Sequence, residues 1–266
     1  MADSLAYRQN VDALSAADLQ NLRAGIAAAK AISDNRGYQY FAGMHGIPQF
    51  RCHHGDLLFL PWHRAYLYTL ELTFRELSAG FTLAYWEWNS SAAQAQGLPA
   101  AYTAEADAGG NPNTLLNSPV NIDAGTIDQL ESNPQTADSL DFSASPPLTI
   151  RNPDAPSDLP TQAAVQRIID TSSTFTDFSR RLEQVHNNVH GWVGGAMGIV
   201  PVSAYDPVFW AHHTNIDRIW YLWQVAHPGA QMPASIANSP LDGFNMTVAD
   251  TLDINHLGYE YVIKTA

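Results

Sequence analysis

The sequence of 266 residues predicts a mainly helical protein with one domain, long irregular loops and little β-structure. Three observations lead to this prediction. In five segments apolar residues recur at three- and four-residue steps, which is typical of helices that pack by one face. Residues 90–160 are rich in Gly, Pro, Asn, Ser and Asp, as loops are. Strand-like character is limited to residues 259–263, which show some of it.

The first two helices are predicted near the N-terminus. Residues 15–34 carry Ala, Leu and Ile at helical spacing, and Ser15 can cap the start of this helix. A second helix is expected to begin at Pro61, because proline is favoured in a first turn, and to end at about Leu77. The aromatic run at 81–89 is expected to be extended or irregular.

Three more helices are predicted at 161–170, 175–191 and 207–225, the last with Pro207 at its first position after an Asp206 cap. We interpret residues 90–160 as surface loops and not as a linker, because the two flanking halves carry matching sets of histidines. One domain over residues 1–266 is therefore expected, with a motif-bearing core at about 40–225.

Charge and composition exclude several classes of partner. The net charge of −13 argues against nucleic acids and anionic membranes. No apolar run is long enough to span a membrane, and the first residues do not have the pattern of a signal peptide. We expect a soluble protein, either cytoplasmic or the mature form of a secreted one. Cys52 is the only cysteine, so no intrachain disulfide can form.

Eight of the ten histidines lie in two clusters, at 45–63 and 186–213. His186 and His190 are four residues apart in a predicted helix, so both imidazoles project from one face and can bind one metal ion. A single histidine is more often a packed residue than a ligand, but two such clusters among aromatic residues favour a metal site. All-imidazole sites suit copper, zinc, iron or nickel. A zinc hydrolase would normally add a carboxylate, and the His-Glu-x-x-His motif is absent.

Three motifs in this sequence resemble those of the tyrosinase and catechol oxidase (polyphenol oxidase) family of dinuclear copper proteins. The first copper-binding signature corresponds to Cys-His-His-Gly-Asp-Leu-Leu-Phe-Leu-Pro-Trp-His-Arg-Ala-Tyr-Leu at 52–67. The second corresponds to Asp-Pro-Val-Phe-Trp-Ala-His-His-Thr-Asn-Ile-Asp-Arg-Ile-Trp at 206–220, and the helix between them to His-Asn-Asn-Val-His-Gly-Trp-Val-Gly-Gly at 186–195. The resemblance covers most of the chain but not the loops at 90–160.

The resemblance implies a central four-helix bundle that holds two copper ions, each on three histidines. His53 and His212 are interpreted as neighbours of the ligands, because the family uses the second histidine of each adjacent pair. The implied ligands are His45, His54 and His63 for the first copper and His186, His190 and His213 for the second.

The resemblance also implies O2-dependent oxidation of monophenols or o-diphenols to o-quinones, with O2 and a small phenol as partners. Glu183 and Asn187 stand where the family holds a water that accepts the phenol proton, although both could be ordinary helix residues. Their presence favours monophenol activity. The alternatives are a catechol oxidase only, or a haemocyanin-like O2 carrier, for whose covering domain the residues after His213 leave little room. No copper-delivery partner is identified by the sequence.

Four further residues are singled out by the resemblance. Cys52 has the spacing to His54 seen in relatives that join this sulfur to the imidazole by a thioether, though a free buried thiol fits as well. Val200 and Met197 lie where relatives narrow the entrance to the coppers, or they simply pack. Glu87 replaces the family's Asp in Tyr-Trp-Asp-Trp, and we assign it a scaffold role. Arg64 and Asp217-Arg218 are expected to form buried ion pairs between the ligand helices.

Overall fold

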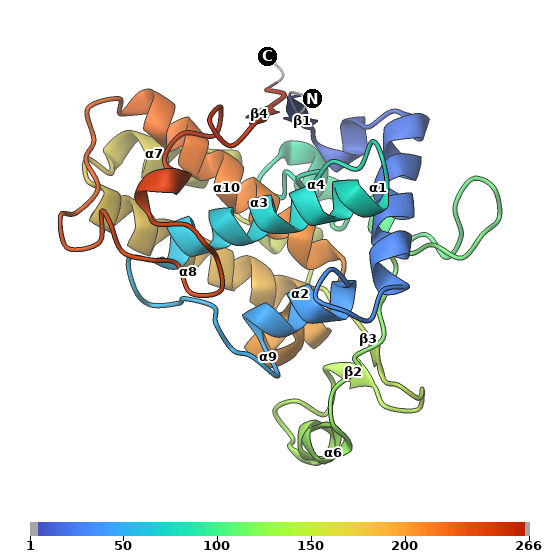
Figure 1. Ribbon diagram of the computed structural model, residues 1–266. Coiled ribbons are helices and arrows are strands. Elements are labelled where there is room, and N and C mark those ends of the chain that lie inside the picture. The colour runs from blue at the N-terminus through green and yellow to red at the C-terminus, as the bar shows by residue number, and fades with distance from the viewer. Residues whose placement is uncertain (1–4, 264–266) are drawn as a thin grey trace.

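Helices account for most of the regular structure in the computed structural model, which describes residues 5–263 (Figure 1). The longer helices are α1 (Ala16–Lys30), α2 (Tyr38–His45), α3 (Phe59–Leu77), α6 (Ala124–Ser132), α7 (Gln162–Thr171), α8 (Phe175–Val193) and α10 (Val208–Ala226). Short helices are α4 (Ser91–Gln96), α5 (Ala100–Thr103) and α9 (Val200–Ser203), with 3-10 turns at Val11–Ala13, Pro156–Asp158, Gly195–Gly198 and Ala249–Thr251. The start of the chain, where the sequence shows no signal-peptide pattern, lies partly outside the described residues.

Strands are few and short, as predicted. β1 (Ala6–Arg8) pairs in parallel with β4 (Tyr259–Tyr261), so segments from the two ends of the sequence lie side by side (Figure 1). β2 (Leu140–Asp141) and β3 (Leu148–Thr149) form a small antiparallel pair in the loop region. Within residues 5–263, no helix is both long and apolar enough to cross a membrane.

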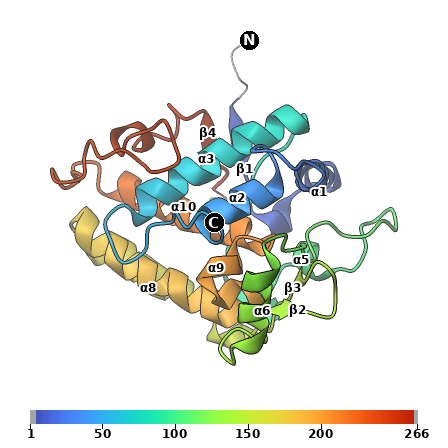
Figure 2. The same cartoon turned by 60° about the horizontal axis from the view of Figure 1, so that its bottom comes forward.

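Four helices, α2, α3, α8 and α10, form the centre of the molecule (Figures 1 and 2). Helix α3 packs against both α10 and α8, α1 covers α3 and α2, and α7 packs on α8 and α10. The predicted mainly helical fold with a four-helix bundle is therefore confirmed. Behind the histidines, the rings of Trp62, Tyr66 and Trp210 are fully buried and form an aromatic wall. The centroid of the Tyr66 ring lies 4.8 Å from that of Trp62 and 5.0 Å from that of Trp210. Such close packing leaves these helices little freedom to shift.

The predicted capping signals explain where the helices begin. The Ser15 hydroxyl accepts a hydrogen bond from the Asp18 backbone N–H, and this caps α1 as expected. At α10 the prediction was displaced by one residue, since Pro207 lies just before the helix. The Asp206 carboxylate nevertheless accepts a hydrogen bond from the Val208 N–H at 2.9 Å, so it still satisfies a free donor of the first turn.

Several predicted boundaries were wrong. Helix α1 ends at Lys30, before residue 34, and α3 begins at Phe59, before Pro61. Residues 90–160 are not entirely irregular, because Ser90 and Asp123 cap helices α4 and α6 through their side-chain oxygens. Helix α2 was missed altogether. It starts at Tyr38 after Gly37, which has no side chain to cap it, so the usual signal of a helix start is absent from the sequence.

Asp217 is the centre of a buried ionic network that joins α3, α10 and the strand pair. Its carboxylate accepts hydrogen bonds from Arg64 on α3, from Arg8 on β1 and from the hydroxyls of Tyr259 and Tyr261 on β4. Burial alone would raise the pKa of Asp217, but the guanidinium groups of Arg64 and Arg8 outweigh it and hold the pKa below its usual value. The predicted Arg64–Asp217 pair is thus confirmed.

The other basic residues complete this network. Arg8 also binds Glu71 on α3 at 2.8 Å, and its guanidinium lies 3.6 Å from the centroid of the Tyr259 ring. Arg218 forms an ion pair with Glu87 and not with a ligand helix. Glu87 therefore takes part in the scaffold, and the two ends of the described chain are tied to the helices that carry the histidines.

We predict that Asp217→Asn lowers the free energy of unfolding by about 3 kcal/mol, because it leaves the buried guanidinium of Arg64 without a counter-charge and leaves Arg8 with Glu71 alone. Urea denaturation followed by circular dichroism measures this value. Asp34→Asn is the matched control, since its ion pair with Arg36 is about half exposed and should contribute less than about 1 kcal/mol. Equal losses in the two variants would contradict a structural role for the buried network.

Candidate metal centre

Three histidines from the first cluster meet at one place. His45 is the last residue of α2, His63 lies in the second turn of α3, and His54 comes from the loop between these helices. The ring centroids of His45 and His54 are 5.3 Å apart, those of His45 and His63 are 5.5 Å apart, and those of His54 and His63 are 5.3 Å apart. The structure thus brings together the three residues that the sequence assigned to the first metal.

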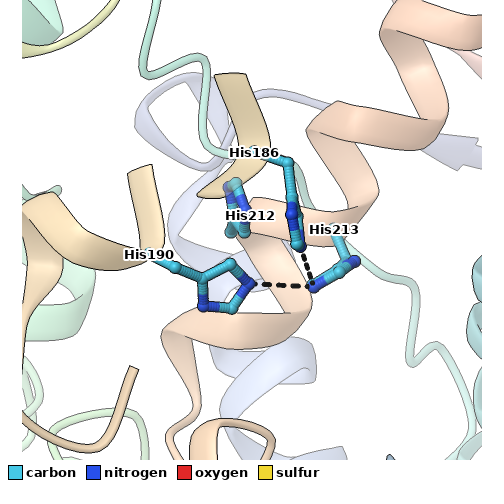
Figure 3. A group of neighbouring side chains, drawn as sticks. All are labelled: His186, His190, His212 and His213. Atoms are coloured by element: carbon cyan, nitrogen blue, oxygen red, sulfur yellow. Dashed lines mark hydrogen bonds between the residues drawn. The ribbon is translucent and has the colours of Figure 1, made fainter. Parts of the chain in front are cut away.

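The second group consists of His186 and His190 on α8 and His213 on α10 (Figure 3). The Nε2 atom of His213 lies 3.2 Å from Nε2 of His186 and 3.2 Å from Nε2 of His190. Imidazole nitrogens bound at 2.0–2.1 Å to one tetrahedral metal ion stand about 3.3 Å from each other. The spacing of these nitrogens therefore fits a shared metal ion.

The two trios face each other across the bundle. The rings of His63 and His213 are stacked, with centroids 4.5 Å apart and planes inclined by 11°. His54 and His186 lie opposite each other as well, with centroids 5.7 Å apart. Two metal ions held by these trios would be close neighbours, as in other two-metal sites.

Hydrogen bonds orient three of the rings. Nδ1 of His63 donates to the Phe59 carbonyl, and Nδ1 of His190 donates to the Met197 carbonyl, both at 2.8 Å. Nδ1 of His186 lies 2.9 Å from Oδ1 of Asn187. Because carbonyl oxygens only accept hydrogen bonds, the proton sits on Nδ1 and leaves the Nε2 lone pair free for a metal.

Several ring nitrogens are buried without a partner among residues 5–263. They include both nitrogens of His45, Nε2 of His63 and Nδ1 of His213. A buried polar atom with no hydrogen bond costs about 1–3 kcal/mol, so such atoms are rare unless something else satisfies them. Metal ions on His45 and His63 would satisfy one nitrogen of each.

Burial keeps these histidines in the form that binds metals. It lowers the pKa of His54 and of His190 to about 4, and it lowers the pKa of the other four well below the usual value of a histidine. Uncharged imidazoles with free Nε2 atoms are a donor set that fits copper, and the residues of this site fit two such ions.

The other member of each adjacent pair lies close to the ligands that the resemblance implies. His53 is partly exposed and its Nδ1 contacts the Asp56 carboxylate at 2.8 Å. His212 is buried beside the second trio, where its ring stacks on His186 with a centroid distance of 5.1 Å (Figure 3). It is His213, however, whose Nε2 stands between those of His186 and His190.

A cavity of about 550 Å³ opens above the histidines. His54 and His190 are partly exposed, and both line this cavity together with Asn187. Met197 and Val200, the residues expected at the entrance, also line it; Met197 is buried, whereas Val200 is 42% exposed.

Glu183 is buried and connects α8 to the loop that carries His54. Its Oε1 accepts a hydrogen bond from the Gly55 backbone N–H at 2.6 Å. Gly55 has a φ of 74°, a left-handed conformation that glycine adopts without strain. Burial raises the pKa of Glu183, which makes its carboxylate a stronger base than an exposed one.

Cys52 is a free, partly buried thiol beside the first trio. Its Sγ lies within 4.8 Å of a ring nitrogen of His45 and of His54. Burial raises the pKa of the thiol to about 11, so it is un-ionised at neutral pH.

Four residues of the cavity wall were not found by sequence reasoning. Phe50, Gly191, Gly198 and Ser203 line the cavity. Their contact with it depends on the loop around Phe50, the end of α8, the 3-10 turn at Gly195–Gly198 and the end of α9, and no sequence signal marks them. Only the position of Gly191 directly after His190 could have indicated its closeness to the site.

Comparison with known proteins identifies the family. Residues 35–226 match the common central domain of tyrosinase. The chain belongs to the tyrosinase family. This confirms the resemblance drawn from the three motifs, and it places the two histidine trios in a family of dinuclear copper proteins.

The relatives of this tyrosinase-family chain include proteins named for two different activities. The A-type hemocyanin of Enteroctopus dofleini is 29% identical over 295 residues, which cover 96% of this chain and 21% of that protein. The tyrosinase of Streptomyces glaucescens is 31% identical over 209 residues, which cover 70% of this chain and 69% of that protein.

Solved structures share the fold. A functional unit of octopus hemocyanin superposes with a TM-score of 0.75 at 27% identity, covering 96% of this chain and 68% of that one. The tyrosinase of Burkholderia thailandensis superposes with a TM-score of 0.78 at 21% identity, covering 98% of this chain and 74% of that one. The helical scaffold is therefore common to both kinds of protein.

We predict that the copper-loaded protein contains about two copper ions per chain and that His213→Ala retains about one. Plasma mass spectrometry of dialysed protein gives the metal content. His212→Ala and His53→Ala are matched controls and should keep both ions. Native protein that carries zinc but no copper would contradict this assignment.

Proposed function

We propose that this chain is an O2-dependent copper oxidase that converts monophenols and o-diphenols to o-quinones. The observation that carries the proposal is the pair of facing histidine trios at the base of an open cavity in which His54 and His190 are partly exposed. A small phenol can therefore approach the ligands directly. We further propose that residues 1–266 form one copper domain.

The proposed ligands are divided between two copper ions. His45, His54 and His63 would hold the first, and His186, His190 and His213 the second. Two bound coppers would supply the one-electron steps by which O2 is reduced. For o-diphenols, two catechols each lose two electrons and two protons. One O2 takes up these four electrons and four protons and becomes two water molecules.

Proton removal is the task of the chain's own residues. A phenol has a pKa of about 10, so it must lose its proton when it binds next to cations. Asn187 lines the cavity, and its side-chain oxygen already accepts from His186, which leaves its NH2 group to hold a water. We propose that this water passes the phenol proton to Glu183, whose Oε1 is fixed by Gly55.

Two narrower or different functions compete with this one. A catechol oxidase would use the same ligands without oxidising monophenols, and Glu183 and Asn187 argue for the wider activity. A reversible O2 carrier is supported by the relatives named hemocyanin. The cavity above the histidines supports an enzyme, since a carrier needs no room for a phenol.

We predict that the copper-loaded protein consumes O2 with catechol and with alkylphenols, and that Glu183→Gln lowers kcat/KM for the monophenol about a hundredfold. Glutamine keeps an oxygen to accept the Gly55 N–H, so the loop should stay in place while the base is lost. Oxidation of catechol should fall much less.

Asp177→Asn is the control, because Asp177 is an exposed acid on the same helix. Oxygen-electrode assays measure these rates. Reversible O2 binding with turnover of neither substrate would favour the carrier, and turnover of catechol alone by the native protein would overrule the role given to Glu183 and Asn187.

We also propose that Cys52 is joined to the His54 ring by a thioether in the copper-loaded protein. Its S–H bond and one ring C–H bond would be broken, and O2 would take up the two electrons and two protons to give hydrogen peroxide. The closeness of its sulfur to His54 supports this. The bond would fix the ring that lies on a loop and not on a helix.

We predict an intact mass lower than the sequence mass by two hydrogens, and no alkylation of Cys52 in denatured protein. Denaturation is needed because the raised pKa of about 11 would protect a free thiol in the folded state. Protein prepared without copper is the control and should be alkylated. A full mass and complete alkylation after copper loading would rule the bond out.

A further inference from the structure

The cavity above the histidines has no charged side chain in its wall. Of the described residues that line it, none is Asp, Glu, Lys or Arg. Its polar groups are also largely occupied: the Ser203 hydroxyl donates to the Val200 carbonyl, and the Asn187 oxygen accepts from His186. A charged substituent on a substrate would find no counter-charge there.

The charged side chains that lie near the wall residues in the sequence already have partners. Glu183, three residues before His186, is not part of the cavity wall, and its Oε1 accepts from the Gly55 backbone N–H. Arg51, next to Phe50, binds Asp242 at 2.9 Å. Asp56, two residues after His54, accepts from the Leu58 backbone N–H and contacts His53. These side chains therefore have partners of their own outside the cavity wall.

An apolar rim stands at the mouth of the cavity. Phe50 is 55% exposed and Val200 is 42% exposed, and both line the cavity. Phe50 has a φ of 53°, an uncommon conformation for a bulky residue. It is held there because its N–H donates to the Gly46 carbonyl at 2.7 Å. An exposed phenyl ring in a strained backbone conformation is an outlier that favours a functional explanation.

Two glycines enlarge the cavity. Gly191 and Gly198 both line it, and a Cβ added at either position would meet no atom within 4 Å. Both have backbone conformations that other residues adopt. The space beside His190 is thus open to a ring substituent, and it can also receive a new side chain by mutation.

Resting on the proposed oxidase function, we propose that this cavity selects uncharged phenols and o-diphenols that carry an apolar ring substituent. A carboxylate or ammonium group on the ring would lose its hydration in the cavity without a compensating partner. An alkyl group would instead pack against Phe50, Met197 and Val200 and leave water. The net charge of −13 would attract an ammonium group at long range, so amines test the proposal most severely.

The test compares three catechols whose side chains have similar size: propylcatechol, dopamine and dihydroxyphenylacetate. We expect the copper-loaded protein to oxidise propylcatechol with a kcat/KM about tenfold or more above that of each charged compound. Unsubstituted catechol is included to test the oxidase function by itself. If catechol is oxidised but either charged compound comes within about twofold of propylcatechol, the proposed selectivity is wrong.

The three catechols also differ in their intrinsic ease of oxidation. A matched pair of variants removes this difference from the comparison. Gly191→Lys places a cation in the open space beside His190, and Gly191→Gln places a neutral side chain of similar length there. Relative to Gly191→Gln, the lysine variant should raise the kcat/KM ratio of dihydroxyphenylacetate to propylcatechol about tenfold. An unchanged ratio would mean that the charge of the wall does not select the substrate.

Calorimetry under anaerobic conditions with propylphenol, tyramine and hydroxyphenylacetate measures the same selectivity without turnover, because no O2 is present to oxidise these phenols. Tighter binding of propylphenol would support the proposal even if catechol oxidation, and with it the proposed function, failed. Equal binding of the three phenols would overturn the proposed selectivity in either case.

Discussion

Desolvation of six uncharged imidazoles is the constraint on which the rest of this structure depends. Each ring must leave water, stay unprotonated and keep a lone pair free of hydrogen bonds, and each unpaired nitrogen costs about 1–3 kcal/mol until a metal binds it. The packing of a single helix or loop cannot offset that free-energy cost. Four helices with an aromatic wall of Trp62, Tyr66 and Trp210 behind them hold the rings in place. The backbone carbonyls of Phe59 and Met197 then decide which nitrogen of His63 and of His190 remains free.

The buried ionic network around Asp217 also holds the ligand helices in place. Arg64 follows His63 directly, and Asp217 lies one turn after His213, so their ion pair joins α3 to α10 close to the two stacked rings. Arg8 and the tyrosines of β4 extend this connection to segments at both ends of the sequence. A buried ion pair contributes little net stability compared with apolar packing, but it tolerates only one relative placement of its partners. The Arg64–Asp217 ion pair therefore fixes the relative placement of α3 and α10, and each of these helices must present a histidine.

Sequence reasoning was reliable where chemistry repeats at helical spacing. His186 and His190 could be placed on one helix face from their spacing alone, and the motifs around His63 and His213 identified the family, while the separation of ligands from neighbours stays a prediction. It failed where structure depends on tertiary context. Helix α2 has no side-chain cap, so His45 was expected in irregular chain although it ends a helix. The helices at 91–132 were missed because Gly, Pro and Asn dominate the segment, although Ser90 and Asp123 are ordinary caps. Phe50 and Gly191 reach the cavity only through the folded loop and the end of α8, which no local pattern encodes.

The division of labour between helices and loops explains how one scaffold can serve both tyrosinases and hemocyanins. Five of the six proposed ligands lie on helices whose positions are over-determined by packing and ion pairs, so the metal centre changes little without loss of the fold. The wall of the cavity comes instead from the loop around Phe50, from the turn around Met197 and Val200, and from glycines with open space beside them. Substitutions of the exposed wall residues cost little stability, because no packed neighbour has to move, whereas Met197 is buried in the core. Substitutions in the cavity wall can therefore change access to the coppers and the selection of phenols without changing the metal ligands. In this chain that freedom has produced an open cavity with an apolar, uncharged wall.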